Sequence, residues 1–325
     1  MKTFLLAGAA AAALMTSAMA DQCPPLKVMA SVDMIVEHGR ILVPVTVDGE
    51  NVYFTLGTAA PYSGISAAYA EAHHFPKRHS NVSFIGLNGE VANTMAMAPS
   101  FGIGRLHDEN TSFVVLNMND AASGPRAPHG VLAADFLRAY DVELDFGANK
   151  LKLISREHCD SVPVYWPSQT MAALPMIVTD ENKISFKMTL DGHVLETVLN
   201  TAIPGSTLRM GIAAEAFGLS NASPGNVQVA MLNQDTPLFA HRFQSLSADG
   251  LTIANPLLVL MPSLADTEIQ HLRNMHTRAG QTAISLPRQP ELVLGLAELK
   301  RLHIYIDYHH QTVYMTPAAA GTAAP

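Results

Sequence analysis

Short runs in which apolar and polar residues alternate occupy most of the chain. Residues 41–47 and 52–56 are two such runs, with an Asp-Gly pair between them, and residues 184–190 and 194–199 repeat the arrangement. Alternation over a few residues is typical of half-buried strands, and Asp-Gly between two runs is a strong signal for a hairpin. The sequence therefore predicts two similar hairpins, one in each half of the chain.

Each predicted hairpin is followed by a tight turn and then by a short segment rich in alanine. These segments, residues 67–74 and 211–217, are expected to be helical, and Ser66 is placed to cap the first of them. Because the same elements follow in the same order, the two halves of the chain are predicted to fold alike.

The two halves also agree residue by residue. Residues 41–63 align with 184–206 at one constant offset without a gap, and residues 130–155 resemble 292–317. The second half is longer, and most of its extra residues are expected within 262–290, where polar residues and prolines interrupt the strand pattern. The pattern predicts an all-β protein with short helices, built as two homologous lobes.

The two ends of the chain differ from the lobes. Residues 1–20 have a basic start, an apolar core and small residues at the end, the pattern of a secretory signal peptide. An exported, periplasmic or secreted protein without stable membrane insertion is therefore expected. The first lobe is predicted over residues 21–160, a linker over 161–175, the second lobe over 176–317, and a disordered tail over 318–325.

Composition and charge narrow the possible partners. Hydrophobic residues make up 48% of the chain, and 20 basic against 28 acidic residues give a formal net charge of -8. This balance argues against nucleic acid and anionic membranes as partners. The two cysteines, Cys23 and Cys159, predict a disulfide in an exported chain, with two free thiols as the alternative. Trp166, the only tryptophan, is expected to pack against a lobe.

The turns after the two hairpins carry the functional argument. They consist of Gly57, Thr58 and Ala59 in the first half and Asn200, Thr201 and Ala202 in the second. With the preceding hairpins and the closing segments, which contain Asp-Phe-Leu and Asp-aromatic pairs, the chain resembles retropepsin-like aspartic peptidases. Its tandem, exported form is similar to bacterial proteins of the aspartyl protease family. The resemblance covers residues 35–317 and implies two retropepsin-like β-barrel lobes in a pepsin-like arrangement around a cleft, complete as a monomer.

In this family each lobe supplies an Asp-Thr-Gly or Asp-Ser-Gly turn. The two carboxylates share one proton, and the ionised member takes a proton from the attacking water while the other polarises the peptide carbonyl. Here Gly57 has no side-chain group and Asn200 has an amide that cannot act as a base. Ala59 and Ala202 replace the turn glycines. The resemblance therefore implies a pseudopeptidase with no catalytic residue.

Two further features of the family's cleft have counterparts in this sequence. Thr58 and Thr201 are retained, and in the family these hydroxyls link the two turns across the cleft floor; ordinary turn threonines are the alternative. A hairpin tip further along could form a flap over the cleft or be a plain hairpin turn. Its residues are Gly86, Leu87, Asn88 and Gly89.

Other candidate groups do not form a recognisable site in the sequence. Fourteen histidines show no metal-binding spacing, so neither a metal nor another cofactor is expected. Asp48 and Asp191 are explained by the hairpin turns that contain them. Asp145 and Asp307 occupy matched positions in the closing strands, which favours structural roles.

The leading hypothesis is an exported, inactive aspartic peptidase homologue that binds a peptide or protein between its lobes. Binding an extended polypeptide needs strand edges and side-chain pockets, and it needs no acid pair. Two alternatives stay open: an active aspartic-type endopeptidase that uses a non-standard acid, and a structural envelope module whose lobe surfaces carry the interaction.

Overall fold

The structure is a computed structural model, and the parts of the chain that it describes are residues 24–85, 91–118, 124–159, 163–232, 236–262 and 289–319. Several predictions fall outside these residues. They are the signal peptide over 1–20, Cys23, the hairpin tip 86–89, most of the long insertion within 262–290, and all but two residues of the tail. These remain predictions.

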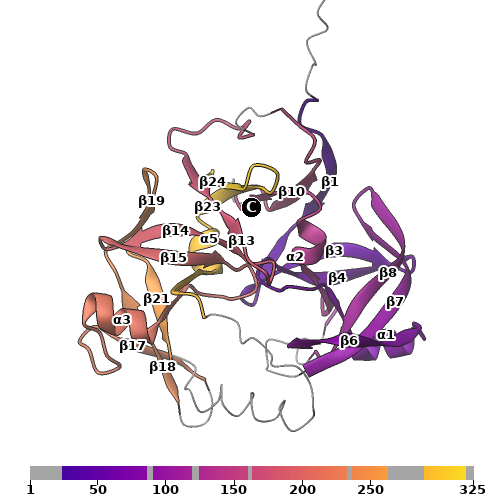
Figure 1. The fold of residues 1–325 in the computed structure, drawn as a ribbon, viewed down its shortest axis with the longest axis horizontal. Helices are drawn as coiled ribbons and strands as arrows, with labels where there is room; N and C mark the ends of the chain where they lie inside the picture. The colour runs from indigo at the N-terminus through magenta and orange to yellow at the C-terminus, as the bar shows by residue number, and fades with distance from the viewer. Residues whose placement is uncertain are drawn as a thin grey trace, which may run out of the picture.

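An eight-stranded sheet forms lobe one, which lies on the right in Figure 1. Its strands, in spatial order, are β2 (Ile35–Glu37), β3 (Arg40–Val47), β4 (Glu50–Gly57), β9 (Pro128–Ala133), β5 (Gly64–Ser66), β8 (Leu106–Leu116), β7 (Val91–Ile103) and β6 (Lys77–Ile85). The first predicted hairpin is the antiparallel pair of β3 and β4, which confirms the alternating pattern read from the sequence.

The sheet of lobe two, on the left in Figure 1, repeats this order. Its strands are β17 (Val227–Met231), β18 (Pro237–Arg242), β21 (Leu257–Met261), β16 (Thr207–Arg209), β22 (Leu292–Leu294), β15 (His193–Leu199), β14 (Ile184–Leu190), β19 (Ser245–Ala248) and β20 (Leu251–Ala254), with β13 (Ile177–Val178) beside β14. Strands β14, β15, β22, β16, β21 and β18 follow one another as β3, β4, β9, β5, β8 and β7 do in lobe one. The repeat in the sequence therefore corresponds to a repeat of strand order in the two lobes.

A third sheet joins the lobes (Figure 1). Its six antiparallel strands, in order, are β1 (Val28–Asp33), β11 (Lys150–Ile154), β10 (Asp141–Asp145), β23 (Leu302–Asp307), β24 (Thr312–Pro317) and β12 (Ala172–Pro175). The central pair, β10 and β23, takes one strand from each lobe. Strand β12 lies within the segment predicted as a linker, and it pairs with β24 as β1 pairs with β11.

Short helices complete each lobe. They are α1 (Ala67–Ala72), α2 (Ala134–Leu137), α3 (Met210–Phe217) and α5 (Leu296–Leu299). The predicted cap of α1 is confirmed, because the Ser66 hydroxyl accepts a hydrogen bond from the N–H of Tyr69 at 3.0 Å. Helix α3 has no side-chain cap and ends at Gly218, whose φ of +65° a glycine adopts without strain.

The core follows the alternation of the strands. Phe54, Phe101 and Phe113 pack edge to face or tilted in lobe one, with ring centroids 5.3–5.9 Å apart. Trp166 stacks on His303 of the joining sheet at 3.6 Å, and its indole N–H donates to Thr316 at 2.9 Å, so its predicted packing role is confirmed. None of the helices in the described residues is long and apolar enough to cross a membrane.

Candidate functional site: the paired turns at the lobe junction

The turns that end β4 and β15 meet at the junction of the lobes and are tied together through their threonines. The Thr58 N–H donates to Thr201 Oγ1 and the Thr201 N–H donates to Thr58 Oγ1, both at 3.1 Å. Each hydroxyl also donates to a carbonyl across the junction, Thr58 to Leu199 at 3.0 Å and Thr201 to Leu56 at 2.7 Å. All four groups are buried, so the two threonines link the lobes symmetrically, as the resemblance implied.

The positions of the family's two acids flank these threonines. Gly57 is the last residue of β4, and Asn200 directly follows β15. The Asn200 side-chain oxygen accepts a hydrogen bond from the Ala202 N–H at 2.9 Å, which closes the turn on itself. The site therefore combines a bare backbone on one side with an amide on the other, and neither residue can exchange a proton at ordinary pH.

Alanine in place of the turn glycine does not strain the backbone. Neither Ala59 nor Ala202 has a positive φ, although ten other non-glycine residues in the described chain do. The two turns keep a conformation open to L-residues, so the shape of the junction floor does not depend on glycine at these positions.

A serine behind each turn fixes it to the closing segment of the same lobe. In lobe one, Ser63 Oγ accepts from the Ala133 N–H at 3.0 Å and donates to Asp135 Oδ1 at 2.7 Å. In lobe two, Ser206 Oγ accepts from the Gly295 N–H at 2.9 Å and donates to Glu298. Both turns are thus held in the same way by polar side chains that face the lobe interior.

Glu298, the acid that contacts the turn serine in lobe two, lies in an unusual environment. Glu298 is 4% exposed, and burial raises its pKa above the ordinary value even though the Ser206 hydroxyl donates to it. The Glu298 carboxyl accepts behind the turn, and in lobe one Asp135 accepts from the backbone N–H groups of Ser63 and Phe136 as well as from the Ser63 hydroxyl. Both acids therefore serve the turns as hydrogen-bond acceptors.

The strands that lead to the predicted flap pair in the expected way. In β6 and β7, which pair antiparallel, Ile85 lies opposite Val91 and Phe84 opposite Ala92. The tip itself lies outside the described residues, and its role as a flap stays a prediction.

The predicted disulfide also reaches beyond the described chain. The Cys159 N–H donates to the carbonyl of Pro24 at 3.1 Å, which brings Cys159 beside the residue that follows Cys23 in the sequence. Cys23 is not among the described residues, so the bridge stays a prediction.

Comparisons with known proteins agree with this architecture. A family model for aspartyl protease matches residues 43–136. The crystal structure of basic 7S globulin from soybean superposes with a TM-score of 0.52 at 10% identity, covering 91% of this chain and 96% of that one. An aspartic proteinase from Irpex lacteus gives a TM-score of 0.51 at 13% identity, with 90% and 98% covered. Conglutin gamma, a basic 7S globulin from lupine seeds, gives 0.51 at 10% identity, with 90% and 95% covered. No curated protein matches the chain.

The family-model match in lobe one and the fold of both lobes agree with each other. The chain has the fold of pepsin-like aspartic proteinases, and residues 43–136 match the aspartyl protease family model, in agreement with the sequence resemblance. A similar fold is found in a protein described as an aspartic proteinase and in two described as basic 7S globulins. At this level of identity the fold is shared, and the activity has to be argued from the residues at the junction.

The joining sheet carries a second cluster of polar residues that sequence reasoning did not find. On the face of β10 and β23 that the segment after β11 covers, Glu143 accepts hydrogen bonds from Lys152 at 2.9 Å, His303 at 3.0 Å and Tyr165 at 2.5 Å. Burial alone would raise the pKa of Glu143, but these three donors outweigh it and lower the pKa below its ordinary value.

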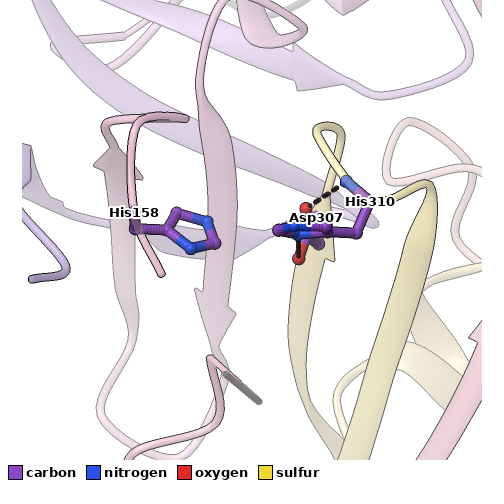
Figure 2. A group of neighbouring side chains, drawn as sticks. All are labelled: His158, Asp307 and His310. Carbon is purple, nitrogen blue, oxygen red and sulfur yellow. Dashed lines mark hydrogen bonds and ion pairs between the residues drawn. The ribbon is translucent and has the colours of Figure 1, made fainter. Parts of the chain in front are cut away.

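Two further buried acids lie at the end of the same strands. His158 Nε2 is 2.6 Å from Asp141 Oδ2, and His310 Nδ1 is 2.8 Å from Asp307 Oδ2. Figure 2 shows His158 reaching towards Asp307 and His310, which lie together on the β23–β24 hairpin. Burial raises the pKa of Asp141 above its ordinary value, against the hydrogen bond from His158. The spacing of these residues in the sequence hides the cluster, because only the pairing of β10 with β23 brings them together.

The four aspartates considered in the sequence have the structural roles expected of them. Asp48 and Asp191 lie in hairpin turns with φ of +50° and +42°. Asp145 accepts from the Ala148 N–H at 2.9 Å, and Asp307 accepts from the His310 N–H at 2.7 Å, so both close the turns after their strands.

Proposed function

We propose that this protein is an exported, catalytically inactive relative of the aspartic peptidases that binds an extended peptide or protein segment between its lobes. One observation supports this above the others. The symmetric linkage of Thr58 and Thr201 is complete, while the two adjoining acid positions hold Gly57 and Asn200. A scaffold with these features keeps the architecture of the family without its acid pair.

The argument against hydrolysis is one of proton transfer. The reaction needs one group that takes a proton from water and another that donates a hydrogen bond to the peptide carbonyl. Gly57 supplies neither, and the oxygen of Asn200 is already occupied by the Ala202 N–H. The acids that contact the turn segments, Asp135 and Glu298, accept hydrogen bonds from serine hydroxyls behind the turns. A shared-proton pair at the junction is therefore not expected.

The argument for binding rests on main-chain chemistry. An extended peptide can pair with exposed strand edges and place alternate side chains in pockets, and this mode uses no acid. The hairpin of β6 and β7 would lie beside such a peptide if its tip acts as the predicted flap. Export is supported by the signal-peptide pattern of residues 1–20.

The test uses substitutions that block the junction without breaking its linkage. Ala202 is partly exposed at the turn, so Ala202→Trp would fill the space above it, and Ala254→Trp on the exposed side of β20 is the matched control. Immobilised mature protein is incubated with a diverse peptide library, and retained peptides are identified by mass spectrometry. Retention that is lost in Ala202→Trp and kept in Ala254→Trp supports the proposal. A folded wild-type protein that retains no peptide contradicts the binding function.

A second candidate function has an observation of its own. Strand β17 is at the edge of the lobe-two sheet, and its alternate residues Val227, Val229 and Met231 are 59%, 45% and 49% exposed. An exposed apolar edge strand is a surface on which another protein can add a strand. Under this interaction-module hypothesis, Val229→Lys abolishes capture of a partner and Ala202→Trp does not. The same library experiment therefore separates the two functions.

A further inference from the structure

We propose that His158, Asp307 and His310 bind one transition-metal ion of the zinc type where the two lobes join. One ligand atom from each of these side chains lies within 4.8 Å of the others. The site is independent of the paired turns and of the proposed peptide binding. It links three parts of the fold: the segment after β11, the end of β23, and the β23–β24 turn (Figure 2).

The orientation of His158 suits a metal ligand. Its Nδ1 is 2.9 Å from the carbonyl oxygen of Cys159, which can only accept, so Nδ1 carries a hydrogen, and Nε2, now paired with Asp141 Oδ2 at 2.6 Å, is the atom that would bind the ion. A histidine that binds metal commonly donates its other N–H to a carbonyl in this way, which fixes the ring. The side chain of His158 is 1% exposed, so the ring is held in place by its surroundings.

A buried carboxylate outside the group lies next to this nitrogen. Asp141 Oδ2 is 2.6 Å from His158 Nε2, and Asp141 is fully buried. The two imidazole nitrogens and the one carboxylate oxygen of the group are ligands of the kinds that zinc takes in sites with three protein ligands, where water fills the fourth position. His310, the one exposed member, leaves a path by which an ion can enter from solvent.

The distances require only small shifts of the donor atoms. Zinc holds its ligands at about 2.0–2.2 Å, so neighbouring donors in a tetrahedral site are about 3.4 Å apart. Donor atoms at the 4.8 Å limit would close by about 1.4 Å, and the hydrogen-bonded atoms of His310 and Asp307, now 2.8 Å apart, would open by about 0.6 Å if both bind. A change of this size is within reach of the His310 side chain, which is exposed and lies on a turn.

Charge distinguishes this group from its neighbour on the same sheet. Glu143, Asp145 and His303 also lie close enough to hold an ion, but Glu143 is already paired with the cationic side chain of Lys152 at 2.9 Å. Asp141 and Asp307 are equally buried, and the only ion-pair partners described for them are histidines. A divalent cation would balance both acids, so this group is the stronger site.

The donor set also selects the ion. Imidazole nitrogen favours zinc, cobalt, nickel and copper, whereas calcium and magnesium prefer sites made of oxygen alone. We therefore expect Zn²⁺ and Co²⁺ to bind, and Ca²⁺ not to bind at the same concentration. Because the ligands come from both lobes, a bound ion would hold the lobes and the connecting segment together.

The experiment uses untagged mature protein from which metal has been removed with a chelator. Zn²⁺ is titrated by calorimetry, and Co²⁺ is titrated by visible absorption, which reports tetrahedral ligands directly. His310→Ala is the test variant, because its side chain is exposed and its loss should not unfold the protein. His309→Ala is the matched control, since His309 is the exposed neighbour that lies outside the group.

The expected result is one Zn²⁺ per chain, affinity at least tenfold weaker in His310→Ala, and unchanged affinity in His309→Ala. Co²⁺ should give the intense visible bands of a tetrahedral site in wild type, and these bands should weaken in His310→Ala. Circular dichroism confirms that each variant is folded. No saturable Zn²⁺ binding by the folded wild type would overturn the proposal. Equal binding by wild type and His310→Ala would overturn it as well.

Discussion

Removing one hydroxyl at the lobe junction tests the role of the threonine linkage. Thr201→Val keeps the size and branching of the side chain and deletes Oγ1. That atom accepts from the Thr58 N–H at 3.1 Å and donates to the Leu56 carbonyl at 2.7 Å. Both partners are buried, so they lose hydrogen bonds that water cannot replace.

The cost can be worked from these two contacts. Leaving a buried donor or acceptor without its partner costs about 1–3 kcal/mol, so two such groups give about 2–4 kcal/mol when part of the loss is relieved by relaxation. Thr58→Val should cost a similar amount. The double variant should cost less than the sum of the single variants, because both threonines belong to one network.

The assay is equilibrium unfolding in urea, followed by the fluorescence of Trp166 and by circular dichroism. Trp166 stacks on the joining sheet and reports its opening. Thr252→Val, on the exposed side of β20, is the control and should change stability by less than about 0.5 kcal/mol. If Thr201→Val destabilises the protein no more than Thr252→Val does, the linkage does not hold the lobes together and the reasoning is refuted.

Three further predictions concern Glu298, Gly295 and the two cysteines. Burial raises the pKa of Glu298, so the stability present below its unfolded pKa of about 4.3 is lost as pH rises through the folded pKa. Glu298→Gln should therefore gain stability relative to wild type between pH 4 and 7. A difference in thermal unfolding that does not change with pH would contradict this. Gly295→Ala should destabilise by about 1–3 kcal/mol, because its Cβ would meet the backbone oxygen of Gly205 at 2.4 Å; unchanged urea unfolding would count against the close contact. Cys23 and Cys159 should be recovered as one linked peptide pair in a non-reducing digest, and alkylation of both thiols before reduction would disprove the bridge.

The parts of the fold that could be predicted from sequence are those governed by local patterns. Alternation and the Asp-Gly pairs placed β14 at residues 184–190, as observed, and placed the β3–β4 hairpin within a few residues. Strand β12 was missed. Its four residues are too few for a clear alternation, and only the pairing with β24 makes them a strand.

The candidate functional residues were likewise only partly predictable from the sequence. The turn residues were found because they recur at a constant offset, and the structure places Thr58 and Thr201 in contact. The group of His158, Asp307 and His310 could not be found, because these residues have no fixed spacing in a motif. They meet only through the antiparallel register of β10 and β23, which a single sequence does not specify.

The absence of an acid pair at the junction is the central claim, and a cleavage assay tests it most directly. Purified mature protein is incubated with a diverse peptide library from about pH 3 to 7, the range in which a carboxylate pair would titrate, and products are read by mass spectrometry. The account predicts no cleavage by protein that circular dichroism shows to be folded. Reproducible cleavage that a transition-state mimic of aspartic peptidases suppresses would contradict the account. Another carboxylate would then have to do the work of the two acids that Gly57 and Asn200 replace.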